Sequence, residues 1–306
     1  MSKVVIDIDK LRNEGFDSQG HQKTLYHQLI DRQIVVVIGA GLSASCEPKS
    51  KVVNRTPLWN SFLADVICNT AKKGLDSHEL FILEAAKKEL NQSRVVDYPE
   101  LFDKISHYLD ESELVWLFRE KFNFDNYDVS EAYPALEQIG QRTTVSINFD
   151  DFYERYIRSQ QGESVTLIKQ DDKGIDCVAR RARNTIFRAH GEPHSLKIVF
   201  GKKSYNELQS SEIYQYLEAL AKTHIFLFIG CSVLGDPDLL KLKDVQGSTN
   251  DMYVLCRESE ADRFSDRFAV LTYPDGNEND PYEYFSGSLK NLGEALERDR
   301  NSGAYS

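Results

Sequence analysis

The chain has 306 residues and a formal net charge of -11, with 41% hydrophobic and 28% charged residues. Its length allows one large α/β domain with an insertion, and its composition is typical of a soluble globular protein. The negative charge argues against direct nucleic-acid binding, because phosphate contacts need clustered cations.

Neither the amino terminus nor the cysteines indicate export. Residues 1–20 are polar and lack periodicity, so we expect a partly ordered leader and no signal peptide. The longest apolar runs are far shorter than the roughly 20 residues of a membrane span. The five cysteines are scattered, without a Cys-x-x-Cys pair, which favours buried thiols, no zinc module and a cytoplasmic location.

The first strong structural signal is the run of β-branched residues 34–38, which leads directly into a glycine-containing turn. Such a run predicts a parallel strand buried on both faces. In the turn, Gly39, Ala40 and Gly41 allow close approach of the backbone to a pyrophosphate, and Ser43 adds a hydroxyl. The sequence therefore predicts a nucleotide site at the end of this strand.

Helical patterns flank this strand. A helix is predicted over 22–32, and another begins near residues 58–59, with Thr56 as its cap and Pro57 in its first turn. From about residue 74 to 130 the apolar spacing is helical without a strand signal. We expect this segment to be a small helical insertion domain.

Strand signals return after the insertion and alternate with helical patterns. The predicted strands cover 143–147, 165–168, 185–189, 225–229, 252–256 and 268–272, and the main helical patterns between and after them cover 205–221, 239–243 and 284–296. This alternation predicts an α/β fold, a Rossmann-like doubly wound parallel sheet. The main domain is placed at 21–300, followed by a flexible tail over 301–306.

Polar residues stand where several of these strands end. Asn148 and Asp150 follow one strand, His190 follows another, and Gly230, Ser232 and Asp236 follow a third. Ligands of open parallel sheets bind at the carboxyl ends of strands, so we expect these side chains in one crevice. The third glycine and the strand-end acid of a dehydrogenase fingerprint are absent, which disfavours hydride transfer.

The order of these motifs resembles the sirtuin-like family. The motifs are Gly39-Ala40-Gly41-Leu42-Ser43, Thr56-Pro57-Leu58-Trp59, Asn148-Phe149-Asp150, His190-Gly191, Gly230-Cys231-Ser232 and Asp236-Pro237-Asp238. Within the family, the sequence is most similar to the prokaryotic sirtuin-like NADases of anti-phage defence. Ile147 stands where deacetylating sirtuins typically carry Gln, and the four-cysteine zinc module is missing, so deacetylation is disfavoured.

The resemblance implies cleavage of NAD⁺ to nicotinamide and ADP-ribose, with no metal. Asn148 would hold the ribose and the attacking water, and His190 would be the general base. Asp150 would grip the carboxamide, or alternatively cap the following helix. Gly230, Ser232 and Asp236 would line the adenosine half, although Asp236 also fits a helix cap.

Two other functions stay open at this point, namely a module that senses NAD or ADP-ribose without turnover, and a protein deacylase. An unregulated NADase would be toxic to its host. The resemblance therefore implies homo-oligomerisation and a separate regulatory partner, such as a HerA-type hexameric ATPase or a short Argonaute system.

Overall fold

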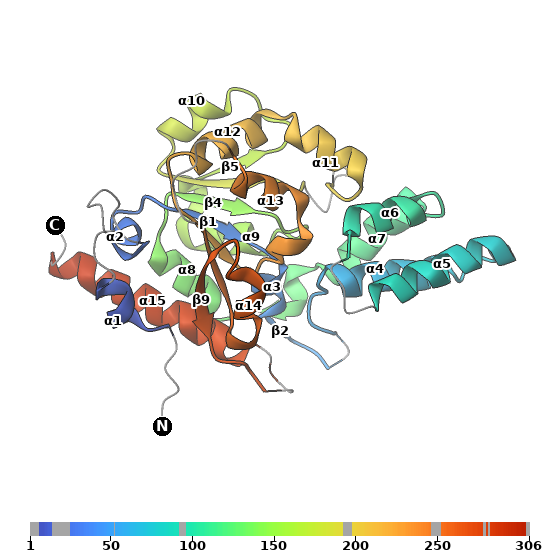
Figure 1. The fold of residues 1–306 in the computed structure, drawn as a ribbon, viewed down its shortest axis with the longest axis horizontal. Helices are drawn as coiled ribbons and strands as arrows, with labels where there is room; N and C mark the ends of the chain where they lie inside the picture. Colours follow the sequence, from blue (N-terminus) through green and yellow to red (C-terminus); the bar gives the residue numbers. More distant parts are fainter. Residues whose placement is uncertain are drawn as a thin grey trace.

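The computed structural model describes residues 6–13, 25–51, 53–91, 96–191, 198–245, 252–277, 280 and 282–303. A central sheet is covered by helices on both faces, and a group of four helices extends to one side (Figure 1). Among the described residues, no helix combines the length and the apolar character that crossing a bilayer requires.

Seven parallel strands form the sheet in the order β5-β6-β4-β1-β7-β8-β9. They are β1 (Val35–Ile38), β4 (Thr143–Ser146), β5 (Val165–Lys169), β6 (Asn184–Arg188), β7 (Phe226–Ile229), β8 (Met252–Arg257) and β9 (Ala269–Tyr273). Every run predicted as a strand is a strand, and the doubly wound α/β fold is confirmed. Because β1 lies between β4 and β7, a crevice opens at its carboxyl end.

The side chains of β1 alternate between two hydrophobic cores. Val36 and Ile38 belong to one core, and Val35 and Val37 to the other. The first core is packed by α1 (Ile8–Asn13), α2 (Leu25–Ile30), α8 (Ala132–Ile139), α9 (Phe152–Gln161) and α15 (Glu283–Ser302). The second is packed by α10 (Ile175–Arg181), α11 (Lys202–Gln209), α12 (Glu212–Ala221), α13 (Pro237–Lys243) and α14 (Ala261–Phe264).

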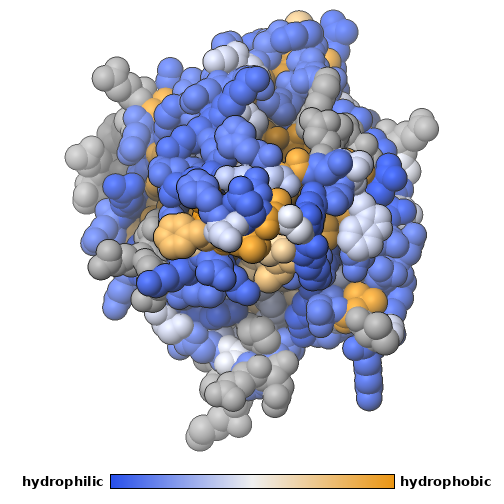
Figure 2. Space-filling model, turned by 90° about the vertical axis from the view of Figure 1, so that its right-hand side faces the viewer, coloured by the Kyte–Doolittle hydropathy of each residue, from blue (hydrophilic) through white to orange (hydrophobic). Residues whose placement is uncertain are grey.

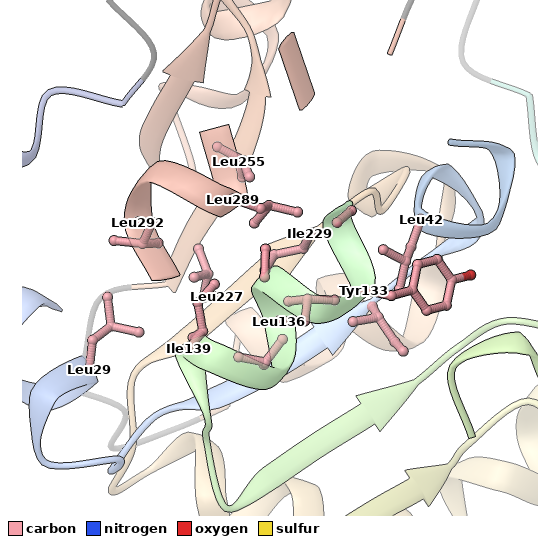
Figure 3. Packing of buried hydrophobic residues seen from close by; sticks show 14 of the residues in the cluster. Leu29, Leu42, Tyr133, Leu136, Ile139, Leu227, Ile229, Leu255, Leu289 and Leu292 are labelled. Carbon is pink, nitrogen blue, oxygen red and sulfur yellow. The ribbon is translucent and has the colours of Figure 1, made fainter. Parts of the chain in front are cut away.

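Figure 3 shows the first core from close by, with side chains of α8 and α15 meeting those of β7. Leu136 of α8, Leu289 of α15 and Ile229 of β7 are each almost completely buried. Burial of a leucine or isoleucine side chain contributes about 1.5–3 kcal/mol. Packing on both faces therefore holds β1, and the turn that follows it, in a fixed position.

The four helices at the side form the helical module, which consists of α4 (Trp59–Thr70), α5 (Ser77–Leu90), α6 (Tyr98–Ser106) and α7 (Glu111–Lys121). The predicted insertion, about 74–130, overlaps this module, whose helices begin at Trp59. Its core includes Phe62 and Phe118, which pack together with Phe149 and Phe200 from the sheet end. The module is thus attached to the crevice by aromatic packing.

Short elements complete the chain. These are α3 (Ala40–Ala44), the antiparallel pair β2 (Glu47–Pro48) and β3 (Tyr127–Asp128), and the 3₁₀ turns η1 (Phe124–Asn126), η2 (Gly162–Ser164), η3 (Val233–Gly235) and η4 (Glu258–Glu260). The pairing of β2 with β3 closes the segment that contains the helical module.

The local predictions differ from the structure at four places. Thr56 is not a helix cap, because α4 begins after Leu58, and the buried Thr56 hydroxyl has no hydrogen-bond partner among the described residues. The pattern over 205–221 forms two helices, since Ser211 caps α12. Within the predicted leader, α1 buries apolar side chains. Cys177 is exposed, whereas buried thiols were expected.

Candidate active site

A cavity of about 380 Å³ lies at the carboxyl ends of β4, β1, β7 and β8, against the helical module. This volume is in the range of small-molecule sites. Seven of the predicted site residues line it, namely Ala40, Gly41, Asn148, Asp150, Gly230, Ser232 and Asp236. The other three, Gly39, Ser43 and His190, are not among its lining residues.

Asn148 and Asp150 are connected by the hydroxyl of Ser43, which lies behind the cavity wall. Asn148 Nδ2 donates to Ser43 Oγ at 3.2 Å, and Ser43 Oγ donates to Asp150 Oδ1 at 2.8 Å. The Asn148 Oδ1 atom is buried and has no hydrogen-bond partner among the described residues. Since buried polar atoms are nearly always paired, this acceptor is available for a ligand.

Of the two roles that the sequence left open for Asp150, the contact with the following helix is observed, and the side chain also lines the cavity. Its Oδ1 also accepts from the backbone N–H of Phe152 at the start of α9, so it satisfies a helix terminus while lining the cavity. Burial raises the pKa of Asp150 to about 6, and the Ser43 hydrogen bond opposes this rise. The carboxyl group is therefore anionic only above that pH.

His190 lies behind the cavity wall, where its ring packs between the rings of Phe149 and Tyr205. Its Nε2 is 3.5 Å from Oδ2 of Asp236, and that carboxylate does line the cavity. The other oxygen of Asp236 accepts from two backbone amides at the start of α13, which confirms the predicted helix cap. Asp236 is therefore fixed between the imidazole and the cavity.

Burial shifts the pKa values of this pair in opposite directions. It lowers the pKa of His190 to about 4 and raises that of Asp236 to about 6. Burial and the nearby Asp236 charge also raise the pKa of Asp238 to about 6. At neutral pH the imidazole is neutral, and Asp236 is an anion with a basicity suited to accepting a proton.

His190, Asp236 and Asp238 each offer one potential ligand atom, and these three atoms lie within 4.8 Å of one another. An imidazole with two carboxylates is a donor set that divalent cations accept. A proton held between His190 Nε2 and Asp236 Oδ2 satisfies the same pair without a metal. The cluster alone therefore assigns no metal to the site.

The glycines bring two turns into close contact. A Cβ on Gly39 would lie 2.6 Å from the carbonyl oxygen of Gly230, and one on Gly41 would lie 2.9 Å from the Gly230 Cα. The amides of Gly39 and Gly41 donate to the carbonyls of Ile229 and Gly230. Both amides therefore already donate to carbonyls of the neighbouring segment. The expectation that they donate to a pyrophosphate is not met in this structure.

A buried arginine joins the turns that carry Asn148 and His190. Arg188 donates to the carbonyls of Gly191 and Phe149, and it pairs with Glu154 at 3.0 Å. Gly191 has a φ of 89°, a conformation that favours glycine. Removing only one partner of such a buried ion pair costs about 3–5 kcal/mol. The contacts of Arg188 thus hold the two turns together, and breaking them would destabilise the protein.

Sequence reasoning missed several cavity residues. Trp59, whose helical spacing is typical of a core residue, lines the cavity while packing edge-on against Phe149. Arg257 and Arg263 supply the only cationic side chains among the described lining residues. Arg257 ends β8, one residue past the predicted strand. It could have been identified from the sequence, because ligands of parallel sheets bind at the carboxyl ends of strands.

Fold and cavity together define a Rossmann-like protein with a cavity at the switch point of its sheet, which is where the ligands of such folds bind. Within the chain, residues 142–279 match the family model of the SIR2-like domain. This segment includes Asn148, Asp150, His190 and Asp236. No curated protein matches the chain.

Three solved structures show a distant likeness. One, described as the structural basis for the mechanism and regulation of Sir2 enzymes, is 13% identical over 92% of this chain and 100% of its own, with a TM-score of 0.44. A mutant Sir2 homologue in complex with ADP ribose is 13% identical over 92% and 98%, with a TM-score of 0.45. Cytosolic 5'-nucleotidase IIIB bound to cytidine is 14% identical over 95% and 97%, with a TM-score of 0.41. Similarities this weak do not indicate an activity for this chain.

Proposed function

We propose that the protein is a sirtuin-like NAD⁺ glycohydrolase, which cleaves NAD⁺ to nicotinamide and ADP-ribose. The observation that carries the proposal is that Asn148 lines the cavity while its buried Oδ1 has no hydrogen-bond partner among the described residues. A ribose hydroxyl or a water would complete its hydrogen bonding. The match of residues 142–279 to the SIR2-like domain supports the same chemistry.

In this reaction the bond between ribose C1' and the nicotinamide nitrogen breaks, and nicotinamide leaves as a neutral molecule with the electron pair. The sugar develops oxocarbenium character, which the Asp150 carboxylate at the cavity wall would stabilise. Water then attacks C1' and loses a proton. Asn148 would orient this water or the ribose, which lowers the entropic part of the barrier.

The geometry favours Asp236 as the group that takes the proton from water. Asp236 lines the cavity, whereas His190 contacts it from behind at 3.5 Å. The proton would then be shared between Asp236 Oδ2 and His190 Nε2. His190, expected from the sequence to be the general base, would in this case act through Asp236.

We further propose that the enzyme depletes NAD⁺ in anti-phage defence and is controlled by assembly. A protein that consumes the NAD⁺ of its own cell must be silent until it is triggered, which supports a separate partner such as a HerA-type ATPase or a short Argonaute system. Contacts between copies are supported by exposed apolar side chains on the helical module, Phe81 and Trp116.

Two alternatives are a sensing module that binds NAD or ADP-ribose without turnover, and a protein deacylase. A sensor needs no proton acceptor in its ligand cavity, so the placement of Asp236 favours an enzyme. A deacylase would need an acylated lysine peptide for nicotinamide release, whereas a glycohydrolase needs only water.

The test is to incubate the purified protein with NAD⁺, with and without its genomic neighbour, and to quantify nicotinamide and ADP-ribose. Asn148→Ala should lower the rate by about 10²-fold or more, because a group that positions the reacting atoms is lost. Asn206→Ala, at an exposed position of α11, is the matched control and should leave the rate unchanged. Equal rates for Asn148→Ala and wild type would refute the assignment.

A further inference from the structure

Arg257 has a guanidinium group that forms no ion pair with any carboxylate of the described residues. Its Nε is buried and has no hydrogen-bond partner among the described residues. The neighbouring arginines differ, since Arg55 pairs with Glu47 and Asp280, and Arg263 lies 3.7 Å from Glu260. A buried donor without an acceptor is rare in proteins, and at a cavity wall it fits a ligand that supplies the acceptor, for which an anion is the best partner of a guanidinium.

The position of Arg257 places this anion on the β8 side of the cavity, away from Asn148. Arg257 ends β8 and Asn148 follows β4, and these two strands are separated by β1 and β7 in the sheet. Three strand spacings correspond to about 14 Å. A dinucleotide with its ribose-nicotinamide bond at Asn148 and its diphosphate near the β1 turn would therefore bring its adenosine half to Arg257.

The surroundings of Arg257 fit an adenosine. Phe264, Tyr273 and Tyr282 line the same end of the cavity, and the Arg257 guanidinium lies 6.0 Å from the centre of the Tyr282 ring. Aromatic rings stack on purines, and a guanidinium binds phosphate through paired N–H donors. Glu260 also lines this end, but the adjacent Arg263 offsets its charge.

We infer that Arg257 binds the 2'-phosphate of a phosphorylated dinucleotide, so that the site takes NADP⁺ as well as NAD⁺. In dinucleotide folds, an arginine near the adenosine ribose is the usual partner of this phosphate, and an acid is the usual partner of a free 2'-hydroxyl. This inference rests on the proposed function for the orientation of the dinucleotide. It adds a class of substrate that the motifs of the sequence did not indicate.

The experiment measures kcat/KM for nicotinamide release from NADP⁺ and NAD⁺ with the full chain. Arg257→Gln should lower the NADP⁺ to NAD⁺ ratio roughly 10- to 100-fold, the scale of one charge-assisted contact. Arg257→Lys should lower it less, because it keeps the charge without the paired donors. Arg180→Gln, at an exposed arginine of α10 that pairs with Asp176, is the matched control and should change the ratio less than about threefold.

Binding by calorimetry to the Asn148→Ala variant separates this inference from the proposed function. Tighter binding of NADP⁺ than of NAD⁺, lost in the Arg257→Gln double variant, supports the subsite even if no nicotinamide is ever released. Equal losses for both dinucleotides would show that Arg257 meets the shared diphosphate and would overturn it. Normal NAD⁺ hydrolysis with an unchanged ratio would also overturn it, while the proposed function would stand.

Discussion

Asp236 sets the pH range in which the site can accept a proton. Burial raises its pKa to about 6, so the carboxyl is protonated at lower pH and cannot take a proton from water. His190, with a pKa lowered to about 4, stays neutral through this range. Activity should therefore rise with pH through about 6. Asp150, the other cavity carboxyl whose pKa is raised to about 6, contributes to the same rise.

We predict that kcat/KM for NAD⁺ falls at least tenfold for each pH unit below that pKa, and that Asp236→Asn lowers the rate about 10²-fold at neutral pH. Initial rates of nicotinamide release between pH 5 and pH 8 measure both effects. Asp244→Asn, at the exposed end of α13, is the control and should keep the wild-type profile. A fully active Asp236→Asn variant would remove this residue from proton transfer.

For single residues, the sequence predicted well which polar side chains lie near the cavity. It did not predict how deeply each of them is buried. Asn148 and Asp150 follow β4 directly, so the rule of strand ends placed them correctly. His190 follows β6 in the same way, but its depth depends on the rings of Phe149 and Tyr205. Such packing of distant residues leaves no periodic signal in a single sequence.

Among the elements, the turns after β1 and β7 are the most constrained. Gly39 contacts the Gly230 carbonyl so closely that any side chain would collide with backbone, which cannot move aside cheaply. We predict that Gly39→Ala destabilises the protein by about 2 kcal/mol or more and weakens NAD⁺ binding. Urea unfolding and calorimetry measure these two effects.

Gly287→Ala provides the control for this prediction. Gly287 lies within α15, and a Cβ there would meet no atom within 4 Å. This substitution should stabilise the protein by roughly 0.5–1 kcal/mol, because alanine is the better helix former. If both variants unfolded at the wild-type urea concentration, close packing of the two turns would be excluded as a constraint.

The elements themselves were largely predictable. Buried parallel strands are continuous apolar runs, and each of the seven runs was recognised. The β2–β3 pair was missed because two residues per strand are too few for a pattern. The break between α11 and α12 was missed because apolar spacing continues across it, although Ser211 is a typical cap.

On the surface of the whole molecule, the helical module carries exposed apolar side chains. The proposed contacts between copies would form there. Viewed from the side of this module, the molecule shows a band of apolar atoms bordered by hydrophilic residues (Figure 2). Trp116 of α7 is 58% exposed, which is unusual for so large an apolar side chain. We predict that Trp116→Ser shifts the protein toward monomers, as measured by light scattering across a concentration series.

The same substitution should leave the urea midpoint unchanged, because an exposed side chain contributes little to folding. The exposed Val178 of α10, which lies outside the helical module, offers a control, and Val178→Ser should keep the wild-type mass. A wild-type protein that stays monomeric at all concentrations would contradict the assembly proposal.

The strand order also determines when the site is completed during synthesis. β1 and β4 leave the ribosome early, but the second neighbour of β1, β7, follows only after β5 and β6. A prematurely terminated chain that ends between Asn148 and Asp236 would carry the amide without the proton acceptor. Under the proposed function, this order of translation would keep unfinished chains from consuming the NAD⁺ of the cell.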